Sequence, residues 1–143
     1  MKFVGAIVFC ILARSTYSQD SVQLYTPPTD SSEFLFEFDM KYLGSSVQVA
    51  PNYSSILSYL IDLMQANPSW TVHVRGHVCC GPSYRVSKRR ARKAYLYLKR
   101  GGIEKDRLTH KGYNDKVPLV FPEKTEEDAL RNRRVDFIIS TNK

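Results

Sequence analysis

Hydrophobic and polar residues alternate in three segments of the chain, EFLFEFDM, WTVHVRGH and RRVDFIIS. In the first segment, Phe34, Phe36 and Phe38 are expected on one face, and Glu33 and Glu37 on the other. A period of two is typical of strands that are buried on one side only. The segment RLTHKGYN, which leads into a turn, is expected to form one more short strand. The pattern therefore predicts four strands.

Two other segments have apolar residues three and four positions apart, which is the spacing of an amphipathic helix. One lies between Pro51 and Pro68, and the other is expected to start at Ser87 and to end near Arg100. A short third helix is expected to start at Thr125, with acidic residues in its first turn. Helices between strands predict an α+β sandwich of the order β-α-β-α-β-(short α)-β, with a four-stranded mixed sheet and helices on one face.

The beginning of the chain predicts export. A positively charged start precedes an apolar run from Phe3 to Ala13, and small or polar residues follow it. This layout predicts a secretory signal peptide at residues 1–18, with a buried N-terminal helix as the alternative. Residues 19–32 hold a Pro-Pro pair and are expected to form a tether, and residues 33–140 are expected to form one domain. We expect no transmembrane segment in the mature chain, because a span needs about 20 apolar residues.

The chain is basic, with 21 Lys and Arg against 14 Asp and Glu and a net charge of +7. A basic surface attracts polyanions or carboxylate-rich ligands. Because the chain is expected to be exported, we expect an acidic ligand outside the cytoplasm and no nucleic-acid partner.

Cys79 and Cys80 are adjacent, just before the basic segment that holds the second helix. An exported pair could oxidise, although adjacent cysteines form only a strained ring that is easily reduced. A thiol or metal enzyme centred on these residues and His77 is the alternative. Two cysteines alone do not complete a zinc site, and no orienting acid for a His–Cys pair is evident. We therefore expect no catalytic residue, no metal and no cofactor.

Several short motifs, in this order and spacing, resemble the OmpA-like C-terminal domain, a family that binds peptidoglycan. They are Gly76-His77, Ser87-x-x-Arg90-Ala91, Gly102-Ile103, Arg107, Gly112 and Asn132-Arg133-Arg134-Val135-Asp136. The resemblance extends from about Glu33 to Ser140. It implies a noncatalytic module that holds the diaminopimelate residue of the peptidoglycan stem peptide.

The resemblance also implies which residues contact the ligand. In the family, an aspartate and a helix arginine hold the two charged groups of diaminopimelate. Here the arginine is Arg90, whose planar fork suits a carboxylate, and the aspartate position holds Cys79. Val78 stands at a threonine position, and Arg134 is expected either beside the pocket or in a structural ion pair. We expect the ligand at Arg90 and residues 78–84.

Five further residues are expected to support this site through turns and close packing: Gly76, His77, Gly112, Asn114 and Asn132. Asn114 stands where the family has a second glycine, and asparagine tolerates the left-handed backbone region. Asn132 is expected to fix the turn into the last strand.

The function implied by the resemblance is stem-peptide recognition in the periplasm or on the periplasmic side of the outer membrane. An outer-membrane protein is a further expected partner. The change from aspartate to Cys79 favours an alternative, because a thiol is a weak acceptor. In that alternative the OmpA-like fold has lost wall binding and serves as a protein-interaction module of the cell envelope.

Overall fold

The computed structural model describes residues 33–37, 42, 53–81 and 83–141. The predictions of a signal peptide and a tether concern residues that lie outside this part, so the division of the chain stays a prediction. In the described part, no helix is both long and apolar enough to cross a bilayer.

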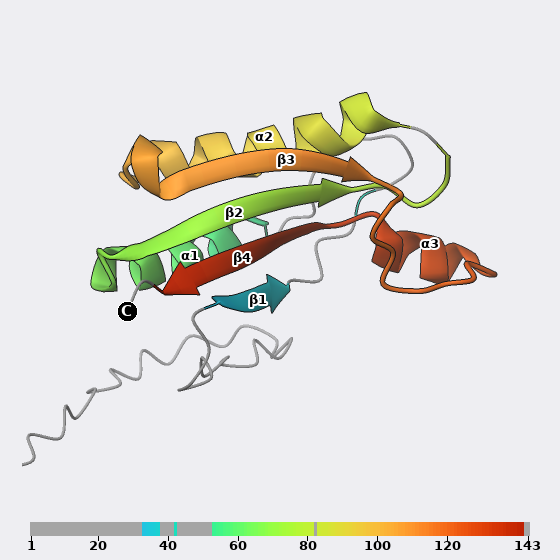
Figure 1. Cartoon of the computed structure of the whole chain (residues 1–143), viewed down its shortest axis with the longest axis horizontal. Helices are drawn as coiled ribbons and strands as arrows, with labels where there is room; N and C mark the ends of the chain where they lie inside the picture. The colour runs from blue at the N-terminus through green and yellow to red at the C-terminus, as the bar shows by residue number, and fades with distance from the viewer. Residues whose placement is uncertain (1–32, 38–41, 43–52, 82, 142–143) are drawn as a thin grey trace, which may run out of the picture.

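Within the described residues, four strands and three α-helices follow one another in the order that the sequence predicts (Figure 1). The elements are β1 (Glu33–Glu37), α1 (Tyr53–Ala66), β2 (Trp70–His77), α2 (Tyr84–Arg100), β3 (Leu108–Asn114), α3 (Glu126–Asn132) and β4 (Val135–Thr141), with a 3₁₀ turn at Lys105–Arg107 before β3. The strands form one sheet in the order β1-β4-β2-β3. Because β2 and β3 are parallel while the other pairs are antiparallel, the sheet is mixed. The predicted α+β class and topology are confirmed.

The hydrophobic core lies between one face of the sheet and the helices α1 and α2, which lie behind the strands in Figure 1. Val72 and Val74 of β2 and Phe137 and Ile139 of β4 point into this core, and all four are buried. The intervening residues, such as Arg75, lie on the opposite face of the sheet. The period of two therefore records which face each residue occupies.

Helix α2 begins one turn earlier than the sequence predicts. The helix starts at Tyr84, and the carbonyl of Ser83 accepts hydrogen bonds from the N–H groups of Val86 and Ser87. Ser87 was expected to cap the helix, but its hydroxyl lies inside the first turn and donates to the carbonyl of Tyr84 at 2.9 Å. A serine can bond back to its own helix in this way, so its presence does not fix a helix start.

Helix α3 does begin where predicted. Thr125 is its N-cap, and Thr125 and Asp128 form a capping box in which each side chain accepts from the other residue's backbone N–H. Hydrogen bonds to the Asp128 carboxylate, first from the backbone N–H of Lys124 and then from Thr125, lower the pKa of Asp128. The capping box therefore satisfies backbone N–H groups at the start of α3.

Candidate functional site

The candidate site lies at the end of the sheet where β2 ends and where α2 and β4 begin, next to α3 (Figure 1). The N–H of His77 donates to the carbonyl of Arg134 at 2.9 Å, and the N–H of Val78 donates to the carbonyl of Asn114 at 3.0 Å. Both His77 and Val78 are buried. The loop that follows therefore starts from a backbone held on both sides.

Arg90 lies at the base of this site and is fully buried. Its Nη1 atom donates to the carbonyl of His77 at 2.9 Å, and its guanidinium carbon lies 4.3 Å from the centre of the Tyr42 ring. Burial lowers the pKa of Arg90 to about 10, so the side chain stays charged at neutral pH. An aromatic face stabilises a cation of this kind. The structure thus places a charged guanidinium between a tyrosine ring and the carbonyl that lies two residues before Cys79.

Cys79 and Cys80 form a disulfide. The Nε atom of Arg133 donates to the Cys79 sulfur at 3.1 Å. The same guanidinium donates to both carboxylate oxygens of Glu126, at 2.7 and 3.1 Å. This pairing lowers the pKa of Glu126. Arg133 therefore links the disulfide to the first turn of α3.

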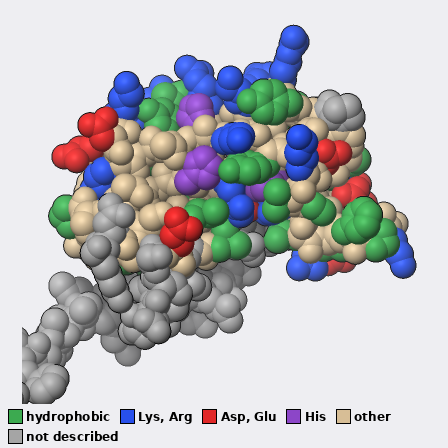
Figure 2. Space-filling view, in the orientation of Figure 1, with side chains coloured by type: hydrophobic (Ala, Val, Ile, Leu, Met, Phe, Trp, Pro, Cys, Tyr) green, Lys and Arg blue, Asp and Glu red, His purple; other side chains and the backbone are tan. Residues whose placement is uncertain are grey.

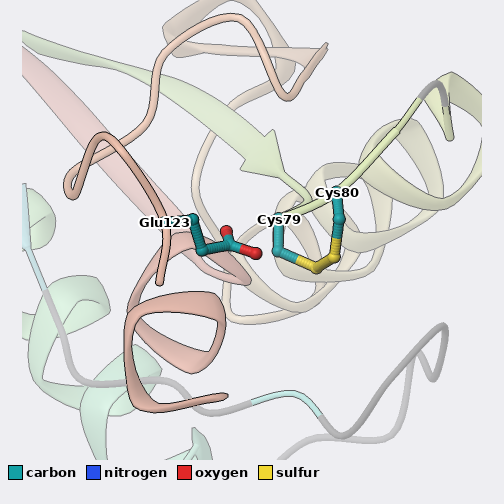
Figure 3. A group of neighbouring side chains, drawn as sticks. All are labelled: Cys79, Cys80 and Glu123. Atoms are coloured by element: carbon teal, nitrogen blue, oxygen red, sulfur yellow. A yellow bond between two sulfur atoms is a disulfide. The ribbon is translucent and has the colours of Figure 1, made fainter. Parts of the chain in front are cut away.

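Glu123 approaches the disulfide from the loop before α3, and its carboxylate is turned toward the sulfur atoms (Figure 3). Its Oε2 atom accepts from Asn132 Nδ2 at 2.9 Å. Asn132 also accepts from the N–H groups of Leu119 and Val120 and donates to the carbonyl of Val120. One buried amide thus fixes the loop that carries Glu123. In the described part of the chain, Cys79, Cys80 and Glu123 are the one group spaced closely enough to hold a metal ion.

A buried carboxylate, Asp136, lies on the outer face of the sheet near the same end. Arg75 donates to both of its oxygens, and Arg134 Nε donates to Oδ2 at 3.0 Å. His77 Nε2 lies 3.1 Å from Oδ2. Burial acts to raise the pKa of Asp136, but the hydrogen bonds from His77 and Arg75 and the charge of Arg134 outweigh it and hold the pKa at about 2. Burial lowers the pKa of His77, so this ring is neutral at pH 7.

Gly76 and Gly112 allow α2 to pack directly on β2 and β3. A Cβ atom on Gly76 would collide with the carbonyl of Ser87, and one on Gly112 would lie 2.6 Å from the backbone nitrogen of Lys88. Asn114 has a φ of 58°, which is the left-handed conformation that its side chain was expected to tolerate. Its Oδ1 atom accepts from the N–H of Ser83 at 2.6 Å, so it also positions the start of α2.

The structure therefore brings Val78, Cys79 and Arg90 together at one end of the sheet. Arg134 adopts the structural arrangement that the sequence left as one of two alternatives, since it contacts Asp136 and donates to the carbonyl of Val117 at 3.1 Å. It is 4% exposed, so a ligand would not reach it without rearrangement. The ligand roles of these four residues stay predictions.

Sequence analysis did not single out Arg133, Glu123 or Asp136 as members of this region. Arg133 and Asp136 do lie within the motif that carries the resemblance, which is a signal that could have identified them. Glu123 had no such signal, because only the fold of a loop with two prolines brings it to a cysteine far away in sequence.

The outer surface of α2 is strongly basic. Its exposed cationic side chains are Arg85, Lys88, Arg89, Arg92, Lys93, Lys99 and Arg100. In Figure 2, Lys and Arg side chains gather along the edge of the molecule where α2 and β3 lie. This surface can attract an acidic ligand toward the site at close range.

Comparison with solved structures identifies the fold. A putative MotB-like protein from Desulfovibrio vulgaris matches with a TM-score of 0.66 and 25% identity, over 77% of this chain and 75% of that one. The peptidoglycan-associated lipoprotein from Burkholderia pseudomallei matches with a TM-score of 0.65 and 15% identity, over 71% of this chain and 88% of that one. This chain has the OmpA-like fold.

No protein-family model matches the chain, whereas sequence comparison finds similarity to a curated protein. Outer membrane porin F of Pseudomonas fluorescens is 33% identical over 104 residues, which is 70% of this chain and 32% of the porin. The chain thus spans about a third of the length of that relative.

Proposed function

We propose that this protein is a noncatalytic peptidoglycan-binding module that recognises a carboxylate of the stem peptide in the periplasm. The observation that carries the proposal is the position of Arg90. Its guanidinium lies against the carbonyl of His77, the last residue of β2, two residues before Cys79. That is the place where the resemblance expects the arginine that holds diaminopimelate. The likeness in fold to a peptidoglycan-associated lipoprotein supports the same reading.

Electrostatics favour a carboxylate ligand at this end of the molecule. Arg90 remains charged at pH 7, and Arg133 is near enough to lower its pKa further. The exposed cations Lys88, Arg89, Arg92 and Lys93 lie within one helical turn of Arg90. An arginine fork can donate two parallel hydrogen bonds to one carboxylate, which makes it selective as well as attractive.

Tyr42 is one of the residues packed against Arg90. The Tyr42 ring is fully buried and lies over the guanidinium, and burial raises the pKa of its hydroxyl above the usual value. A ligand carboxylate that reaches Arg90 therefore has to displace this ring. A cation–π contact with the guanidinium helps to hold the Tyr42 ring in place. A ligand carboxylate that hydrogen-bonds to the guanidinium can compensate for the loss of this contact.

The location and the partners of the protein follow from the proposed binding of peptidoglycan. A domain that binds peptidoglycan works in the periplasm or on the periplasmic side of the outer membrane. Similarity to a segment of an outer-membrane porin supports an outer-membrane protein as a second partner.

The finer claim, recognition of the stem carboxylate, can be tested by calorimetric titration. The protein would be titrated with a soluble stem peptide that ends in diaminopimelate, and with the same peptide amidated at the diaminopimelate carboxylate. We expect binding of the first and a loss of about tenfold or more for the second, since a charge-assisted hydrogen bond contributes about 1.5–3 kcal/mol. Equal affinities would overturn carboxylate recognition.

A second function, an envelope module that binds another protein, is favoured by two observations. Arg90 is 0% exposed, and a disulfide stands where the resemblance expects a carboxylate. Exposed apolar side chains on the loop before α3, with Phe121 at 85%, would suit a protein partner. Failure of both stem peptides to bind would favour this second function.

A further inference from the structure

The group formed by Cys79, Cys80 and Glu123 adjoins the proposed ligand site and shares Cys79 with it. We propose that, after reduction of the disulfide, these three residues bind a thiophilic divalent metal ion such as Zn²⁺ or Cd²⁺. The protein would then have a metal site that exists only in its reduced state. This inference does not rest on peptidoglycan binding.

The spacing of the ligand atoms carries the proposal. The two sulfur atoms and a carboxylate oxygen of Glu123 all lie within 4.8 Å of one another. Ligand atoms around a tetrahedral zinc ion, each about 2.0–2.3 Å from the metal, have separations below this limit. Figure 3 shows the carboxylate and the two cysteines converging from different loops. Little movement is therefore needed to bring three ligands around one ion.

The surroundings hold the third ligand in place. Asn132 is 1% exposed and donates to Glu123 Oε2 at 2.9 Å, which leaves Oε1 for a metal ion. A hydrogen bond to one oxygen of a ligating carboxylate orients the other, as is common around metal ions. Arg133 does not hold Glu123, because its Nη atoms are bonded to Glu126. The hydrogen bond from Arg133 Nε to the Cys79 sulfur can persist when that sulfur is a metal ligand.

The chemistry of the donors selects the ion. Two thiolates and one carboxylate suit Zn²⁺ and Cd²⁺, whereas Mg²⁺ and Ca²⁺ take oxygen ligands. Cys79 and Glu123 are half-buried and Cys80 is exposed, so one side of the group is open to solvent. A water molecule can therefore supply the fourth ligand, and a reductant can reach the disulfide.

The reaction balances in two steps. A dithiol reductant gives two electrons and two protons to the Cys79–Cys80 bond, which becomes two thiols, and the reductant becomes a disulfide. The metal ion then displaces the two thiol protons, which pass to solvent, and forms two metal–sulfur bonds. The carboxylate of Glu123 donates one oxygen without any change in oxidation state. In the oxidised protein the sulfur atoms carry no thiolate, so this ligand set is absent.

The test is a titration with Cd²⁺ alone, followed by the ultraviolet charge-transfer band of the cadmium–thiolate bond. One sample is oxidised, and another is reduced with a dithiol that is then removed by anaerobic desalting. We expect no band in the oxidised sample and one equivalent bound in the reduced sample. A reduced sample without the band, or an oxidised sample that binds equally, would overturn the proposal.

Variants separate the three-residue site from a simple dithiol. Glu123→Gln should weaken Cd²⁺ binding by about tenfold or more, because even the loss of a supporting partner costs 10–100-fold. Glu127→Gln, an exposed carboxylate on the neighbouring helix, is the matched control and should bind like the original protein. Circular dichroism of each reduced variant checks that it is folded. If Glu123→Gln binds as tightly as Glu127→Gln, Glu123 is not a ligand and the proposed site is wrong.

Discussion

The guanidinium of Arg75 holds both carboxylate oxygens of Asp136, with Nε–Oδ1 at 2.6 Å and Nη2–Oδ2 at 3.0 Å. Arg134, which immediately precedes β4, contacts the same carboxylate, and His77 lies beside that carboxylate. Three side chains, Arg75, His77 and Arg134, thus contact the one buried carboxylate of Asp136. This cluster fixes the end of the sheet from which the Cys79 loop departs.

Replacement of Asp136 by asparagine should strongly destabilise the protein. The variant Asp136→Asn removes the one carboxylate that Arg75 and Arg134 share, and a buried cation that loses its partner costs about 3–5 kcal/mol. Urea unfolding at pH 7 would measure the loss. Asp106→Asn, at an exposed carboxylate, is the control and should change the free energy of unfolding by no more than about 0.5 kcal/mol. A loss below about 1 kcal/mol in Asp136→Asn would contradict the role given to this carboxylate.

The pKa of Asp136 predicts a specific loss of stability in acid. Its pKa falls from 3.8 to about 2 on folding, so the unfolded chain binds a proton more readily. The stabilisation is complete above pH 3.8 and is lost as the pH falls through 2. It amounts to about 2 kcal/mol. Urea unfolding between pH 5 and 1.5 should show this slope, and the slope should be smaller in Asp136→Asn. An equal slope in both proteins would mean that other groups cause the acid sensitivity.

Asn132 should control the loop that carries Glu123. Asn132→Ala removes four hydrogen bonds to Leu119, Val120 and Glu123. Backbone groups left without partners cost about 1–3 kcal/mol, so we expect a loss of about that size. Amide hydrogen exchange should accelerate at Leu119 and Val120 while remaining slow in β2. Unchanged exchange at these two amides would show that the loop is held by other contacts.

Restoring a carboxylate at position 79 should strengthen peptidoglycan binding. We compare Cys79→Asp/Cys80→Ala with Cys79→Ala/Cys80→Ala, so that both proteins lack the disulfide. An aspartate beside Arg90 could accept hydrogen bonds from the ammonium of diaminopimelate, which predicts about tenfold tighter binding to sacculi. If the aspartate instead pairs only with Arg133, the two variants will bind sacculi equally. That result would exclude recognition of diaminopimelate by a carboxylate at position 79.

The sequence predicted the fold well because strands and helices have local signatures. The alternation of Val72, His73 and Val74 specifies the two faces of β2 without knowledge of any other strand. The start of α2 was misjudged, since Ser87 can bond either to the end of a helix or back to the carbonyl of Tyr84. Only the structure distinguishes these two cases.

The candidate site was less predictable because its contacts join residues that are far apart in sequence. Arg133 and Cys79 are 54 residues apart, and no periodicity relates them. The resemblance indicated Arg90 as a ligand contact, but not that Tyr42 covers it. Whether a ring covers a polar side chain depends on how the loops pack. The pattern of hydrophobic residues carries little information about loop packing.

The most direct test of the central claim is cosedimentation of the protein with purified peptidoglycan sacculi, with and without free diaminopimelate as competitor. Arg90→Lys, which keeps the charge but loses the fork, is compared with Arg92→Lys on the exposed face of α2, after circular dichroism has shown that both are folded. We expect that the original protein and Arg92→Lys will pellet with the sacculi, that Arg90→Lys will do so at least about tenfold more weakly, and that diaminopimelate will release the bound protein. If the original protein stays in the supernatant, peptidoglycan binding by this chain is contradicted.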